Sequence, residues 1–255
     1  MKGIILAAGA GTRLNGQDTA MPKCMLSFAG RPLIELQLRA LRSCGIDEVT
    51  VLVGFEADRV RRACGEGVQF IENTRFSQTN SLYSLSLARP VLMDGFVVMN
   101  CDVLFHPALL LDLLTARHAD ALLVSYPKDG DPPFGEEEMK VHVRRGRVVD
   151  MGKDLSPSMT DGENVGIAKF SADAAASLVA AMDRRLDAGN LRDWAPRAFA
   201  DYAREGALYA IGTRGLPWTE IDTADDYRYA STVVYPAIRR VFHDLPSERA
   251  VETLR

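Results

Sequence analysis

The sequence has few cysteines, few histidines and no long apolar run. Its four cysteines, Cys24, Cys44, Cys64 and Cys101, are scattered without a CxxC pair, and its four histidines share no metal-ligand spacing, which argues against a zinc site. The apolar stretch at residues 3–9 is too short to cross a bilayer and lacks the parts of a secretory signal. We therefore expect a cytoplasmic protein with reduced thiols and no membrane partner.

Basic charge is also scarce. The 30 lysines and arginines are outnumbered by 34 acidic residues, for a net charge of -4, and no long basic run is present. The electrostatic footprint of a nucleic-acid binder is missing, so the expected partner is a small molecule. With 255 residues, 47% of them hydrophobic, the chain is long enough for one globular domain with a sizeable core.

Short apolar runs alternate with helical patterns, which predicts an α/β fold with a doubly wound, mainly parallel sheet. The expected strands cover residues 3–7, 48–53, 68–71, 95–100 and 121–125, and the expected helices cover 32–44, 57–64, 81–89 and 107–117. Residues 139–143 and 147–151 flank Arg144-Arg145-Gly146 and predict a hairpin. With a strand at 164–170, the hairpin indicates a small antiparallel lobe at the mouth of the sheet.

The remaining chain is expected to form helices at 171–188 and 192–204 and a strand pair from 208–212 and 218–222. After residue 225 the pattern is helical to the end, with an interruption at Pro236. These last helices have apolar positions that fit packing on the sheet or on a second subunit, so a homodimer stays open.

The first expected strand runs into a loop of small residues, with the sequence IILAAGAGTRL at positions 4–14. Such a loop lets backbone N–H groups approach a phosphate or a base closely. A dinucleotide fingerprint needs a glycine where Leu14 stands, and a P-loop needs Lys and Ser or Thr where Gln17 and Asp18 stand. Both are excluded. The loop instead offers Arg13 and Lys23, two cations able to converge on a triphosphate and stabilise a leaving pyrophosphate.

LAAGAGTRL followed by PKCML resembles the LAAGxGTRL…PKxLL signature of nucleotidyltransferases of the sugar-phosphate and choline-phosphate type. The resemblance implies a Rossmann-like fold of the nucleotide-diphospho-sugar transferase type. It also implies nucleotide contacts from Leu6, Ala7, Ala8, Gly9, Ala10, Gly11, Thr12, Arg13 and Lys23. Cys24 and Asn100 depart from the family pattern, but neither departure removes a charge that the chemistry needs.

A carboxylate, Asp102, ends the apolar strand FVVMN at 96–100, and ligands of doubly wound sheets bind at the carboxyl ends of strands. In the resembling family this aspartate contacts the nucleotide and binds Mg²⁺, and a second ligand comes from a segment like WTEIDT at 218–223, where Asp222 is the matching position. Carboxylate and phosphate oxygens suit Mg²⁺. Glu220 and Asp225 are rival ligands. Because Glu220 shares a strand face with Asp222, we expect it to support the metal site or to contact the acceptor.

The segment NTRFSQTNSLYSL at 73–85 leads from a loop into a helix that Asn80 or Thr79 can cap. It is similar to a segment of bacterial phosphocholine cytidylyltransferases, where sugar nucleotidyltransferases usually carry a different sequence. The resemblance favours CTP and implies that Asn80 and Ser81 lie against the nucleoside.

The acceptor contacts follow from the same resemblance. Residues 163–167 resemble the family's acceptor-binding strand, and Lys153 stands where the family often has a lysine that grips the acceptor phosphate. The expected contacts are Tyr83, Lys153, Glu163, Asn164, Trp218 and Glu220. A choline-like acceptor needs aromatic faces and a carboxylate, which Trp218, Tyr83 and the glutamates at 136–138 supply. A 2-aminoethylphosphonate-like amine or a polyol phosphate stays open.

These features together predict a single nucleotidyltransferase domain over residues 1–255. Its nucleotide-binding half covers 1–126, its acceptor-binding half 127–225 and its C-terminal helices 226–255. It is expected to transfer CMP from CTP to a small phosphorylated or phosphonate acceptor, with Mg²⁺ as cofactor and Arg13 and Lys23 as catalytic residues. A sugar-1-phosphate nucleotidyltransferase using another nucleoside triphosphate is the nearer alternative. A non-catalytic nucleotide-binding regulatory module is the more distant one.

Overall fold

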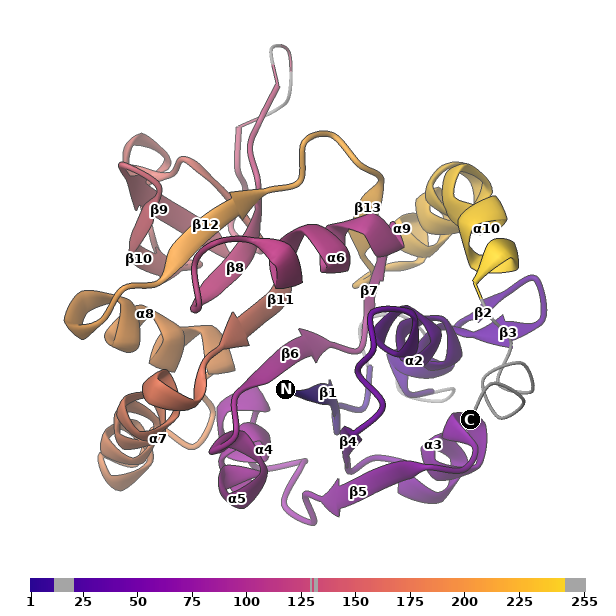
Figure 1. Ribbon diagram of the computed structural model, residues 1–255, viewed down its shortest axis with the longest axis horizontal. Helices are drawn as coiled ribbons and strands as arrows, with labels where there is room; N and C mark the ends of the chain where they lie inside the picture. Colours follow the sequence, from indigo (N-terminus) through magenta and orange to yellow (C-terminus); the bar gives the residue numbers. More distant parts are fainter. Residues whose placement is uncertain (12–20, 129, 131–132, 246–255) are drawn as a thin grey trace.

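The computed structural model describes residues 1–11, 21–128, 130 and 133–245. Thr12 and Arg13, both expected to contact the nucleotide, lie outside the described residues. Within the described ranges, nine strands form one sheet in the order β5-β4-β1-β6-β11-β8-β12-β10-β9 (Figure 1).

The parallel part of the sheet confirms the prediction. Strand β1 (Lys2–Ala7) lies between β4 (Val49–Val53) and β6 (Phe96–Asn100), parallel to both, and β5 (Val68–Glu72) continues the sheet beside β4. The next strand in space is β11 (Gly162–Phe170), which runs antiparallel to both β6 and β8 (Ala121–Ser125). The sheet therefore interleaves the chain segments on either side of residue 126.

Helices cover both faces of the sheet, as expected for a doubly wound fold. Ile5 and Ala7 point into one apolar core with α2 (Leu33–Ser43), α3 (Ala57–Cys64), α6 (Pro107–Thr115) and α10 (Tyr235–Asp244). Ile4 and Leu6 point into a second core with α4 (Ser81–Leu87), α5 (Arg89–Leu92), α7 (Ala172–Asp187) and α8 (Ala195–Glu205). This alternation along one strand buries β1 on both sides.

The predicted hairpin is present as β9 (Lys140–Arg144) and β10 (Arg147–Gly152), and Arg145 and Gly146 take the positive φ angles of 52° and 79° that a tight turn needs. The hairpin is joined to the main sheet rather than separate from it. Strand β9 also pairs with the start of β11, and β10 pairs with β12 (Tyr209–Gly212).

The predicted pairing of 208–212 with 218–222 is wrong. Strand β12 pairs parallel with β8, whereas β13 (Trp218–Glu220) pairs antiparallel with β7 (Val103–Phe105), a short strand just after Asp102. Strand β12 thus lies between β8 and β10 in the large sheet, whereas β13 and β7 form a separate two-stranded sheet. The N–H of Ile221 donates to the carbonyl of Asp102 at 3.0 Å, so the β7–β13 pair brings Asp222 beside Asp102.

The C-terminal helices pack on the same chain. They comprise α9 (Ala224–Tyr229), a π-helical turn (Ala230–Val234) and α10. The ring centroid of Phe28, in the hairpin of β2 (Ser27–Phe28) and β3 (Arg31–Pro32), lies 5.6 Å from that of Tyr227 and 5.4 Å from that of Tyr235. The interruption predicted at Pro236 corresponds to the boundary between the π-helical turn and α10, where this proline stands in the first turn and its missing N–H is tolerated.

The cysteines and the helices both bear on the environment expected for the chain. All four cysteines are free thiols. None of the described helices is long and apolar enough to span a membrane.

Gly54 lets the end of β4 approach the loop after β1. A Cβ at this position would lie 2.7 Å from the carbonyl oxygen of Ala8 and 2.9 Å from the Cβ of Phe76. We predict that Gly54→Ala lowers the free energy of unfolding by about 1–3 kcal/mol, as measured by urea titration. At Gly9 a Cβ would meet nothing within 4 Å, so Gly9→Ala is the matched control. Equal losses in the two variants would contradict the close-approach argument.

Candidate active site

A cavity of about 290 Å³ opens at the carboxyl ends of β1 and β6. Strand β1 contributes Leu6 to its wall, and the loop after β1 contributes Ala8, Gly9 and Gly11. Gly11 has a φ of +63°, and a Cβ there would lie 2.8 Å from the carbonyl oxygen of Met21. Glycine therefore allows the loop to pass close to the segment that carries Lys23. Ala7 is buried in the core, and Ala10 is not part of the wall.

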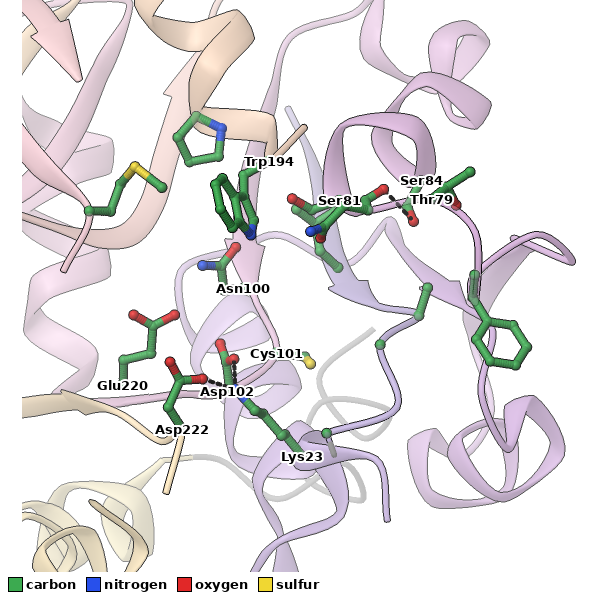
Figure 2. Close-up of a pocket in the computed structure, with 18 of the residues that line it drawn as sticks. Lys23, Thr79, Ser81, Ser84, Asn100, Cys101, Asp102, Trp194, Glu220 and Asp222 are labelled. Atoms are coloured by element: carbon green, nitrogen blue, oxygen red, sulfur yellow. Dashed lines mark hydrogen bonds and ion pairs between the residues drawn. The ribbon is translucent and has the colours of Figure 1, made fainter. Parts of the chain in front are cut away.

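Lys23 lies between two carboxylates from distant parts of the chain. Its Nζ is 2.8 Å from Asp102 and also forms an ion pair with Asp222 (Figure 2). A 3₁₀ turn (Lys23–Met25) orients the lysine, because the neighbouring Cys24 is fully buried in the core. Burial lowers the pKa of Lys23, but the two carboxylates outweigh this effect and hold the pKa above its usual value. Lys23 is therefore a cation at physiological pH.

The single positive charge of Lys23 does not balance the acidic side chains around it. Burial, followed by the charges of Asp102 and Asp222, raises the pKa of Glu220 to about 8. Oδ1 of Asp102 is buried, and none of the described residues donates a hydrogen bond to it. A buried carboxylate oxygen without a donor is costly unless a cation or a ligand satisfies it. An oxygen-only donor set of this kind fits a hard divalent cation.

Another wall is formed by the first turn of α4 and the segment that leads into it. Its residues are Asn73, Phe76, Thr79, Asn80, Ser81 and Ser84. Asn80 is the helix cap, because its Oδ1 accepts the N–H of Ser81 at 2.8 Å. Asn73 is 1% exposed, and its Nδ2 donates to the hydroxyls of Thr79 and Ser84 at 3.0 Å each. Sequence reasoning singled out Asn80 and Ser81 but missed Asn73. The signal available for Asn73 was a polar residue directly after a strand.

The expected acceptor contacts divide into two groups. Lys153, Asn164 and Glu220 line the cavity. The other three residues, Tyr83, Glu163 and Trp218, are not part of its wall. Arg75 lies over the ring of Tyr83, and Glu163 lies on β11. Trp218 pairs with Phe105 in the β7–β13 sheet and packs against the core. Burial, with a further contribution from Glu138, raises the pKa of Glu163 to about 7.

Trp194, at the start of α8, lines the cavity although sequence reasoning did not select it. Its side chain is left 39% exposed. The Nζ of Lys153 lies 5.1 Å from the centroid of its ring and 2.9 Å from Glu137. A single tryptophan before a helix carries no sequence pattern that distinguishes a cavity wall from a core position.

Lys23, Asp102 and Asp222 meet beyond the carboxyl end of β6, the edge of a doubly wound sheet where ligands bind. The chain matches the MobA-like NTP transferase domain over residues 3–194 and belongs to that family.

Relatives are found among curated proteins and solved structures. A bifunctional IPC transferase and DIPP synthase of Rubrobacter xylanophilus is 31% identical over 90% of this chain, and the chain spans about half (51%) of its length. A choline-phosphate cytidylyltransferase of Streptococcus pneumoniae is 26% identical, over 89% of this chain and 96% of that protein. The structure of an inositol-1-phosphate CTP transferase of T. maritima has the same fold, with a TM-score of 0.76 and 21% identity over 96% of this chain and 98% of that one. The family match and the curated relatives identify the chain as a nucleotidyltransferase, and the solved structure shows that the fold is shared.

Because the pKa of Glu163 is raised, we predict that the free energy of unfolding depends on pH. Between pH 4.5, its ordinary pKa, and about 7, the folded protein holds a proton that the unfolded chain has released. Stability therefore falls as pH rises through this window, by up to about 3 kcal/mol for this group. We expect Glu163→Gln to flatten the dependence of the urea midpoint on pH. Glu136→Gln, at an exposed position, is the control. Parallel pH profiles for wild type and Glu163→Gln would contradict the assignment.

Proposed function

We propose that the protein transfers CMP from CTP to a small phosphorylated or phosphonate acceptor and releases pyrophosphate. The observation that carries the proposal is the meeting of Lys23, Asp102 and Asp222 in a cavity that also holds Lys153. The segment at 73–85, which resembles that of phosphocholine cytidylyltransferases, supports CTP. So do the names of the relatives from Streptococcus pneumoniae and T. maritima. A sugar-1-phosphate nucleotidyltransferase with another nucleotide is the nearest alternative.

The reaction is a direct displacement. An oxygen of the acceptor's phosphate or phosphonate forms a bond to the α-phosphorus, and the bond from that phosphorus to the oxygen bridging to the β-phosphate breaks. Pyrophosphate leaves with the electron pair. The protonated Lys23 stabilises the negative charge that develops on it, and we assign the same role to Arg13. The attacking oxygen is already ionised at neutral pH, so positioning replaces a general base.

We place Mg²⁺ at Asp102 and Asp222, with Glu220 as a supporting carboxylate. The open, buried Oδ1 of Asp102 supports this placement. Among the described residues, no group of three His, Cys, Asp or Glu side chains could hold a metal ion. Mg²⁺ usually takes one or two carboxylates together with the phosphates of its substrate. When bound, Mg²⁺ polarises the α-phosphate and neutralises charge in the transition state.

The acceptor side of the cavity combines one cation with several carboxyl groups. We assign the acceptor's phosphate to Lys153, with Asn164 beside it in the wall. Glu138 and Glu220 both lie close enough to Glu163 for mutual charge effects. Oε2 of Glu138 is buried without a donor among the described residues. A cationic group on the acceptor would favour ionisation of these carboxyl groups, whose pKa values are raised in its absence. The cluster therefore favours an acceptor with an amine or quaternary ammonium group over a polyol.

Lys23→Ala and Asp102→Ala test the catalytic centre. We expect each variant to release pyrophosphate at least about 10²-fold more slowly than wild type with CTP and Mg²⁺. Lys23→Ala removes a cation that stabilises the leaving pyrophosphate, and Asp102→Ala removes a carboxylate assigned to Mg²⁺. Lys2→Ala, which removes a lysine paired with Asp94 outside the cavity wall, is the matched control and should retain the wild-type rate. Wild-type rates in either cavity variant, with folding checked by circular dichroism, would refute the assignment.

A further inference from the structure

The start of α4 is hydrogen-bonded to the segment that leads into α8. The N–H groups of Asn80 and Leu82 donate to the carbonyls of Leu191 and Asp193, at 3.0 and 3.2 Å. The N–H of Ala195 donates to Oγ of Ser81 at 2.9 Å, across 114 residues of sequence. Two segments that both contribute to the cavity wall are thus joined.

These bonds also occupy the N-terminus of α4. The N–H of Ser81 already donates to Oδ1 of Asn80, and the N–H of Leu82 to Asp193. A helix terminus binds an anion through such N–H groups when they are open. Here the N–H groups of Ser81 and Leu82 are satisfied within the chain, and the hydroxyl oxygen of Ser81 accepts the N–H of Ala195. Ser81 is therefore better placed to fix the neighbouring segment than to bind the nucleotide.

The segment held by Ser81 carries Trp194. Asp193, on one side of the tryptophan, is 2.8 Å from Arg185 of α7, and Ala195, on the other side, is bonded to Ser81. Figure 2 shows Trp194 beside Ser81 and away from the group formed by Lys23, Asp102 and Asp222. Fixed at both flanks, the ring presents its exposed part to the cavity.

The ring of Trp194 in turn contacts the side chain of Lys153. The ammonium of Lys153 lies 5.1 Å from the ring centroid, within cation–π range. The backbone of Lys153 is held as well, since the buried Lys140 donates to its carbonyl oxygen at 2.5 Å and Arg197 of α8 pairs with the adjacent Asp154 at 2.6 Å. Main chain and side chain of Lys153 are therefore both anchored, and α8 contributes to each anchor.

We propose that Ser81 and Trp194 are positioning residues for the acceptor: Ser81 fixes Trp194, and the ring of Trp194 fixes the ammonium of Lys153 that binds the acceptor's phosphate or phosphonate. The proposal rests on the proposed function, because it assumes that Lys153 meets the acceptor. It moves Ser81 from the nucleotide side of the reaction to the acceptor side.

Steady-state kinetics with CTP and with phosphocholine or 2-aminoethylphosphonate test the link. We expect Ser81→Ala and Trp194→Leu to raise KM for the acceptor about tenfold and to leave KM for CTP within about twofold of wild type. Ser81→Thr and Trp194→Phe keep the hydroxyl and an aromatic ring and should stay near wild type. Ser86→Ala is the matched control, because Ser86 donates to the carbonyl of Tyr83 within α4 and is not in the cavity wall. A rise in KM for CTP with Ser81→Ala would overturn the proposal.

A double-mutant cycle tests whether Trp194 acts through Lys153. In a Lys153→Met background, Trp194→Leu should add no further increase in acceptor KM. Fully multiplicative effects would overturn the link, since they would show that Trp194 acts independently.

Equilibrium binding of phosphocholine, followed by tryptophan fluorescence, separates this proposal from the proposed function. If wild type releases no pyrophosphate but Ser81→Ala weakens binding, the proposed function fails and the link stands. If turnover is normal and Ser81→Ala changes neither binding nor acceptor KM, the link fails and the proposed function stands.

Discussion

The ion-pair group of Lys23, Asp102 and Asp222 is the constraint on which the rest of the structure depends. Three segments far apart in the chain must meet for it to form: the turn after the first loop, the end of β6 and the segment after β13. Removing one partner of a mostly buried pair leaves an uncompensated charge, which typically costs about 3–5 kcal/mol. The short β7–β13 pair, which places residue 222 next to residue 102, therefore serves both stability and chemistry.

The spacing between the two ends of the cavity is set by the sheet. Strand β11, which carries Asn164, is the direct neighbour of β6, which leads into Asp102, with Ile167 opposite Met99. Gly166 allows the close approach, because its φ is +83° and a Cβ there would lie 2.9 Å from the side chain of Asn100. Substrate positioning on rigid strands suits a reaction that needs no general base and depends on geometry and charge.

Much of the fold was predictable from sequence because the parallel strands are apolar runs separated by helical patterns. Asp102 and Asp222 were predictable from a motif. The β7–β13 pair was not, since strands of three residues show no periodicity. Trp194 and Asn73 were missed for another reason: each reaches the cavity through tertiary contacts that leave no local pattern. Tyr83 and Trp218 carry suitable chemistry, but the packing of their own elements directs them away from the wall.

The most direct test of the account is the fate of an isotopic label. CTP, GTP, UTP and dTTP, each labelled at the α-phosphate, are incubated with the protein, Mg²⁺ and a panel of acceptors that includes phosphocholine, 2-aminoethylphosphonate and sugar 1-phosphates. The account predicts that label from CTP appears in a cytidine-linked product of an amine-bearing acceptor, together with stoichiometric pyrophosphate. Label transfer only from another nucleotide to a sugar phosphate, or binding of nucleotide without any transfer, would contradict it.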